Sequence, residues 1–221
     1  MRIASLLGLV AVLGVSTVAL AEQIDNPEYA QWSKYKAGTY VTTQQAMTMS
    51  GDMPAGMPAG MDMSAMMPKV TTTTKLTEVK PDSLTLEVSS DTTQMGRTTN
   101  SKNTRTIPAK IDKPTATGTA PATSAAQLKD LKEGKDTFQI NGKTLDTTTR
   151  EYTATNSADV PGMNRGGRGG ANGEAMPGES HVKIWSSPDV PGGMVKMEMT
   201  AKQQQMEIKT TNTVTDYKVE K

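Results

Sequence analysis

The sequence predicts a mainly β fold, all-β or β-dominated α+β, with roughly eight to ten antiparallel strands and two short helices. Three observations lead to this prediction. Residues 83–89 alternate apolar and polar side chains, as a strand with one buried face does. Residues 141–142 are Asn-Gly, a pair that favours the tight turn of a hairpin. Residues 194–202 alternate again, after a turn rich in Pro and Gly.

The N-terminal segment is typical of a signal peptide. An apolar run over 3–20 closes on residues 19–21 (Ala-Leu-Ala), the small-x-small pattern of a signal peptidase site. We therefore expect cleavage after Ala21, which leaves residues 22–221 as a single antiparallel β domain exported to the periplasm or the extracellular space. The alternative is an uncleaved membrane anchor.

The composition limits both the stability and the partners of the mature chain. With no Cys, one Phe, two Trp and five Tyr, we expect a thin core that depends on packing and strand pairing alone. A net charge of +1 gives no field that would attract nucleic acid or anionic lipid. No cysteine follows the cleavage site and no later stretch is apolar enough to span a bilayer, so we expect neither a lipid anchor nor a membrane span.

The first element of the mature chain is predicted to be a short helix over 26–36. Asn26 can cap it, and Pro27 suits the first helical position. An aromatic stripe that we expect to pack on a sheet edge is formed by Tyr29, Trp32 and Tyr35. The β-branched and aromatic residues over 39–43 predict the first strand.

A meander is predicted next, with Leu84, Leu86 and Val88 on its buried face. Its strands are expected over 69–79, 83–89, 92–99 and 104–107. A connector is then predicted over 108–124, followed by an amphipathic helix over 124–133 that ends at Gly134.

The remaining strands follow from the Asn141-Gly142 turn, whose residues accept the positive φ angles of type I′. Phe138 and Ile140 precede the turn on the first strand. The later strands are expected over 143–155, 181–187 and 194–202, with a turn at 188–193, and a last strand pair is expected over 205–219.

Two low-complexity stretches interrupt the pattern, at 44–67 and 156–180. Their Gly, Pro and Met content offers little side chain to offset the entropy of ordering the chain, so both are predicted to be disordered loops inserted between strands. The second contains Arg-Gly-Gly twice, which in an exported chain of this charge does not predict nucleic-acid binding.

A cluster of methionines is the chemically distinctive feature of the first loop. Thioethers are soft ligands that can hold Cu(I). The spacing resembles the methionine motifs of extracytoplasmic copper-handling proteins, which implies copper(I) as a possible cofactor. The alternatives are an expanded Gly-Met-Pro-Ala repeat, oxidant scavenging, or soft contacts with a partner. The candidate ligands are Met47, Met49, Met53, Met57, Met61, Met63, Met66 and Met67.

Catalytic chemistry has little support in the sequence. His181 is the only histidine, which excludes multi-histidine metal sites, and its neighbours Glu179 and Ser180 alternate in direction along a predicted strand. No nucleophile elbow or phosphate-binding loop is present. We therefore predict no catalytic residues.

Residues 183–202 carry a family resemblance: a strand that ends at Trp185, a Pro-Gly-Gly turn, and an alternating strand. This stretch resembles uncharacterised exported bacterial β-proteins whose curved sheet is similar to that of lipoprotein-localisation carriers. The resemblance implies an incomplete barrel with a helix across its mouth and a concave face that admits an apolar ligand or acyl chain. The residues it implies for that face are Trp185, Val195, Met197 and Met199, and the alternative is that they only fill the core.

Together these features predict an exported, non-enzymatic protein with a binding or structural role at the cell envelope. The runner-up is a Cu(I)-binding or sequestering protein that uses the methionine-rich loop. A hydrolase is third.

Overall fold

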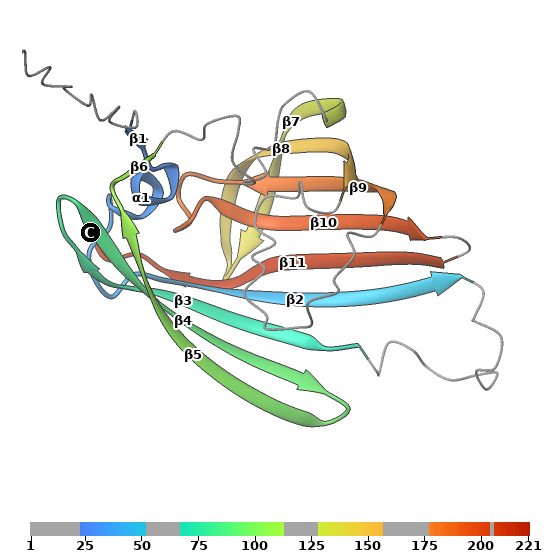
Figure 1. Ribbon diagram of the computed structural model, residues 1–221, viewed down its shortest axis with the longest axis horizontal. Coiled ribbons are helices and arrows are strands. Elements are labelled where there is room, and N and C mark those ends of the chain that lie inside the picture. Colours follow the sequence, from blue (N-terminus) through green and yellow to red (C-terminus); the bar gives the residue numbers. More distant parts are fainter. Residues whose placement is uncertain (1–22, 52–66, 113–127, 157–176, 204–205) are drawn as a thin grey trace, which may run out of the picture.

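The computed structural model describes residues 23–51, 67–112, 128–156, 177–203 and 206–221. These residues form one helix, α1 (Pro27–Trp32), and eleven strands (Figure 1). The strands are β1 (Gln23–Asp25), β2 (Tyr40–Gly51), β3 (Lys69–Val79), β4 (Ser83–Gln94), β5 (Arg97–Pro108), β6 (Lys110–Asp112), β7 (Leu128–Ile140), β8 (Lys143–Asn156), β9 (Pro177–Ser186), β10 (Met194–Gln203) and β11 (Met206–Lys218). The mainly β prediction is confirmed.

Nine strands form one antiparallel sheet in the order β5-β4-β3-β2-β11-β10-β9-β8-β7. Neighbours in the sheet are neighbours in the chain except at β2 and β11, whose pairing joins the meander β2–β5 to the meander β7–β11. The sheet is twisted and curved, and it is open, because β5 and β7 lie at its two edges and do not pair (Figure 1). A second small sheet pairs β1 with β6.

Most of the predicted strand pairs are present. The hairpin of β3 and β4 begins at Lys69 and turns at 80–82, as expected. The turn between β7 and β8 has positive φ angles at Asn141 (52°) and Gly142 (74°), which confirms the Asn-Gly prediction.

The helix predicted over 124–133 is wrong for its described part, because 128–133 begin β7. Lys132 and Glu133 pair with Glu151 and Arg150 of β8. A bulge before Lys132, where Asp130 has φ 57°, shifts the register and breaks the alternation that marks a strand. Strand pairing therefore overrides the local helical pattern, and only one helix is found in the described ranges.

Five further boundaries differ from the sequence prediction. The strand expected over 92–99 is divided by the turn at Met95 and Gly96, so 92–94 end β4 and 97–99 begin β5. The strand pair expected over 205–219 is the single strand β11 from Met206. Residues 44–51 were expected in a loop but extend β2, since they pair along their whole length with β11. At the second predicted loop, 177–180 begin β9, and within the predicted connector 110–112 form β6. The rest of both loops, the rest of the connector beyond 112 and the predicted leader lie outside the described residues.

The predicted N-terminal helix is confirmed, although it ends at Trp32 rather than at residue 36. Asn26 caps it by accepting a hydrogen bond from the Glu28 backbone N–H at 3.0 Å. The helix lies at one end of the nine-stranded sheet, beside the C-terminal end of the chain (Figure 1). We call this the helix end; it also carries the turns at 80–82 and 187–193, and we call the opposite end of the strands the far end. No described helix is long and apolar enough to cross a membrane.

The larger hydrophobic cluster lies at the helix end. Trp32 packs there against residues that are almost completely buried, among them Leu76, Leu84, Leu86 and Val195. A smaller cluster lies along β8, β9 and β10 and consists of Tyr152, Ala154, Val182, Met197 and Met199.

Candidate functional site

A cleft of about 730 Å³ lies on the concave face of the sheet, within the size range of small-molecule sites. Gln45 pairs with Asn212, and Asn212 pairs with Met197, so three adjacent strands present these side chains to the same face. The lining consists of Glu28, Gln31, Trp32, Val41, Thr43, Gln45, Thr72, Thr74, Val88, Ser90, Ser101, Asn103, Arg105, Pro191, Gly192, Met194, Met197 and Asn212.

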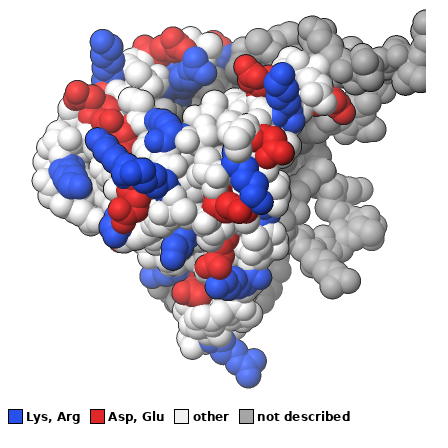
Figure 2. Space-filling view, turned by 90° about the vertical axis from the view of Figure 1, so that its left-hand side faces the viewer, with Lys and Arg blue, Asp and Glu red and all other residues white. Residues whose placement is uncertain are grey.

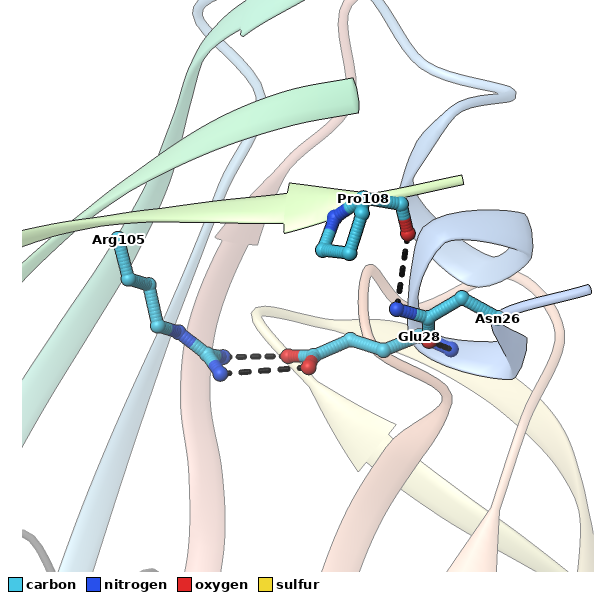
Figure 3. Close-up of polar contacts among 4 residues, drawn as sticks. All are labelled: Asn26, Glu28, Arg105 and Pro108. Carbon is cyan, nitrogen blue, oxygen red and sulfur yellow. Dashed lines mark hydrogen bonds and ion pairs between the residues drawn. The ribbon is translucent and has the colours of Figure 1, made fainter. Parts of the chain in front are cut away.

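The helix end of the cleft carries an ion pair between Glu28 of α1 and Arg105 of β5. The pairing is bidentate: one guanidinium nitrogen lies 3.2 Å from Glu28 Oε2, and the other makes a close contact with Oε1 (Figure 3). Each side chain is 37% exposed, so solvent screens the pair and its contribution to stability is small. Its geometric effect is to fix α1 against the edge strand.

Further polar contacts hold α1 and the residues after it between two parts of the sheet. On one side, Asn26 donates to the Pro108 carbonyl at 2.9 Å (Figure 3) and Tyr29 donates to the Lys80 carbonyl at 2.8 Å. On the other side, Lys34 and Tyr35 both donate to the Pro188 carbonyl. The helix therefore bridges the two meanders across the mouth of the curve.

Gly192, in the turn at 187–193, lies against Trp32 of α1. Its φ is 79°, and a Cβ built on it would lie 3.5 Å from the indole ring of Trp32. The positive φ is what favours glycine here, because other residues rarely adopt it, whereas a Cβ at 3.5 Å would make an ordinary contact with the ring.

Hydroxyl and amide groups dominate the wall and floor of the cleft. Thr72 Oγ1 and Ser90 Oγ lie 3.0 Å apart across β3 and β4. On the floor, Asn212 Oδ1 is buried and makes no hydrogen bond with the described residues. Such a surface offers donors and acceptors to a polar ligand, with apolar contact from Trp32 and Met197.

The four residues implied for an apolar ligand are not brought together on one surface. Met197 lines the cleft, and Met199 lies beside it on the same face of β10. Val195 is completely buried in the larger cluster. Trp185 pairs with Lys196, which follows Val195 and precedes Met197 in β10, so Trp185 lies on the face opposite to the cleft.

Trp185 is 8% exposed and belongs to the larger hydrophobic cluster, and charged side chains lie over its ring. The ammonium groups of Lys183 and Lys196 lie 4.9 Å and 4.8 Å from its ring centroid. Its indole N–H donates to Asp136 Oδ2 at 3.0 Å. This hydrogen bond, with one from the Thr137 backbone N–H, lowers the pKa of the Asp136 carboxyl below its ordinary value.

The predicted metal ligands divide between described and undescribed residues. Met47 and Met49 lie in β2, two and four positions after Gln45, and therefore share the concave face. Met67 precedes β3. Met53, Met57, Met61, Met63 and Met66 lie outside the described residues.

His181 lies on β9 with its side chain 53% exposed, and its Nε2 is 3.3 Å from a carboxylate oxygen of Glu151. The residue pairs with Thr200 and Thr153 on the face opposite to Met199. It therefore does not contribute to the cleft. No group of three or more His, Cys, Asp or Glu side chains suited to a metal ion occurs among the described residues.

Charges of both signs are interspersed on the helix-end side of the molecule (Figure 2).

A second cavity, of about 600 Å³, lies near Pro188 and is lined by Asp136, Asp146 and neighbouring residues of the β7–β8 hairpin.

The sequence prediction did not find the cleft. Its lining comes from seven separate segments, and Thr and Ser in strands gave only a signal for strand formation. The one local hint was the acidic residue in the first turn of the capped helix, because a carboxylate there can pair with a basic side chain on a facing strand.

No protein-family model and no curated protein matches the chain. Solved structures do match. One of them, described as "a putative lipoprotein" from Parabacteroides distasonis, is 11% identical, has a TM-score of 0.42, and is matched over 85% of this chain and 98% of its own. A likeness at this level identifies neither a family nor a ligand.

Proposed function

We propose that this protein is an exported, non-catalytic binding protein of the cell envelope, and that the concave cleft receives its ligand. The observation that carries the proposal is the lining: hydroxyl and amide side chains surround a cavity of about 730 Å³, and one buried amide oxygen on its floor has no partner. An unpaired buried acceptor costs roughly 1–3 kcal/mol, which a ligand N–H or O–H would recover.

The lining favours a polar ligand over an acyl chain. An acyl chain would cover Asn212, Gln45 and Thr43 without satisfying them, and this would add to the cost of desolvation. A ligand with amide and hydroxyl groups, as in fragments of cell-wall glycan and peptide, would pair with these groups and still contact Trp32 and Met197. The described lining has one cation and one anion, which pair with each other, so the ligand is expected to be neutral or zwitterionic.

The two tryptophans allow a direct test, because Trp32 lines the cleft and Trp185 does not. In Trp185→Phe the only remaining indole is Trp32, at the cleft; in Trp32→Phe it is Trp185, on the opposite face. Both variants are titrated with a soluble cell-wall digest and, separately, with palmitate. We expect the digest to change the fluorescence of the Trp32-only protein alone.

A matched pair of exposed substitutions on β5 gives the control. Asn103→Arg places a large side chain in the cleft, whereas Thr104→Arg adds the same charge to the other face. The proposal requires that only Asn103→Arg abolishes the response. Saturable binding of palmitate with no response to the digest would instead identify an apolar carrier.

A further inference from the structure

The concave face also carries four methionines on strands that flank β11. Met47 and Met49 come from β2, and Met197 and Met199 come from β10. Thr210 pairs with Met47 on one side and with Met199 on the other, so these two thioethers flank one short side chain. Their Cα atoms are separated by two strand spacings, roughly 10 Å, across a surface that curves inward.

The geometry points to a site for a monovalent soft cation, Cu(I) or its redox-inert counterpart Ag(I), between the thioethers of Met47 and Met199, which face each other across Thr210. Thioether sulfur prefers soft cations, and the chain has no cysteine that could supply a thiolate. The long, unbranched side chains of methionine can bend over Thr210 and bring their sulfur atoms together.

The strand between the methionines supplies a second, independent observation. Thr210 is 1% exposed, and its Oγ1 makes no hydrogen bond within the described part of the chain. The Oδ1 of Asn212, two residues along the same face, is unpaired in the same way. Both oxygens lie beside the methionine strands, so the face between Met47 and Met199 is not a fully satisfied core.

The proposed cation site is smaller and more deeply buried than the proposed ligand site in the cleft. Thr210 is 1% exposed and does not line the cleft, whereas Met47 beside it is half-buried. The site between Met47 and Met199 therefore lies beside the cleft, and the two meet near Met197 and Asn212.

Ligation by methionine predicts that the affinity for the ion does not depend on pH. Thioethers carry no proton at any physiological pH, so binding releases none, unlike binding to thiolate or imidazole. Affinity for Ag(I) should therefore be the same at pH 5 and pH 7. A site that used His181 or a carboxylate would weaken at the lower pH.

The experiment uses the mature chain, labelled with ¹³C at the methionine methyls and titrated with Ag(I). We expect one equivalent of Ag(I) to shift the methyl signals of Met47 and Met199 and to leave that of Met95, which is 64% exposed in the β4–β5 turn. A titration that leaves these two signals unmoved while silver binds elsewhere overturns the proposal.

Affinity is then compared in a background that carries Gln at positions 53, 57, 61, 63 and 66, so that these five methionines cannot compete for silver. Met47→Leu/Met199→Leu conserves volume and should fold, and it should bind Ag(I) at least about tenfold more weakly. Met95→Leu is the matched control and should bind unchanged. Equal affinity in the double variant and the background contradicts the site.

Discussion

The two ends of β3, β4 and β5 differ in what holds them together. At the helix end, Leu76, Leu84 and Leu86 are almost completely buried under α1. Toward the far end, the same strands carry Thr, Ser and Asn, which are half-buried or exposed and join in pairs such as Thr93 and Thr98, 3.0 Å apart. Backbone pairing runs through both halves, but side-chain burial is concentrated in one.

This difference separates stability from recognition along the same strands. Burying a leucine side chain is worth about 1.5–3 kcal/mol, whereas an exposed hydroxyl pair adds much less. The helix end can therefore hold the fold, and the polar halves can line a cleft without being needed for the core.

The largest expected effect is at the helix end. Leu86→Ala should destabilise the protein by about 2–5 kcal/mol, because it leaves a cavity among fully buried neighbours. Leu131→Ala removes the same atoms from an exposed position on β7 and should cost less than about 0.5 kcal/mol. Urea unfolding followed by circular dichroism measures both, and similar losses for the two variants contradict a core concentrated under α1.

The attachment of α1 should have an intermediate effect. Asn26→Ala removes the helix cap and the bond to the Pro108 carbonyl, and should cost about 1–2 kcal/mol. The matched control is Asn100→Ala, which removes only an exposed bond to Asp91 in the far half. Equal unfolding midpoints for the two variants would show that the helix adds nothing to the sheet.

Among the uncharged contacts, hydrogen-bonded pairs of polar side chains in the far half should contribute least to the free energy of unfolding. Thr72→Ala removes the hydroxyl that contacts Ser90 and should cost no more than about 1 kcal/mol. Ligand binding in the cleft should weaken in this variant, since Thr72 is part of the lining. A loss of stability as large as that of Leu86→Ala would remove the distinction between the two halves.

The smallest effect is a pH dependence on the face opposite to the cleft. The pKa of Asp136 is lowered in the folded state by the Trp185 indole and the Thr137 backbone N–H. Its ionised form therefore favours folding above the ordinary carboxyl pKa of about 3.9, and this contribution is lost as pH falls through the lower folded value. The urea midpoint should fall less between pH 5 and pH 2–3 in Asp136→Asn than in the wild type. If the urea midpoints of both proteins fall equally with pH, the hydrogen bond between Trp185 and Asp136 does not contribute to the acid dependence of stability.

The sequence was informative where local chemistry decides structure. The cap at Asn26, the Asn141-Gly142 turn and the alternation around Leu84 identified a helix, a hairpin and a buried strand before any contact was known. Local pattern failed at 128–133, where pairing with β8 imposes a strand, and at 44–51, where pairing with β11 extends one through a low-complexity stretch. The cleft depends on side chains from both meanders, and their meeting follows from the pairing of β2 with β11, for which the sequence has no local signal.

Hydrogen exchange at single-residue resolution tests the central claim most directly. Amides at the helix end of β4, such as those of Leu84 and Leu86, should exchange only through global unfolding, with an opening free energy that falls with urea as the whole protein does. Amides of Thr92 and Thr93, in the far half of the same strand, should exchange through local opening with a clearly lower free energy. Equal opening free energies along β4, with the same urea dependence, would contradict the division into a stabilising end and a recognition surface.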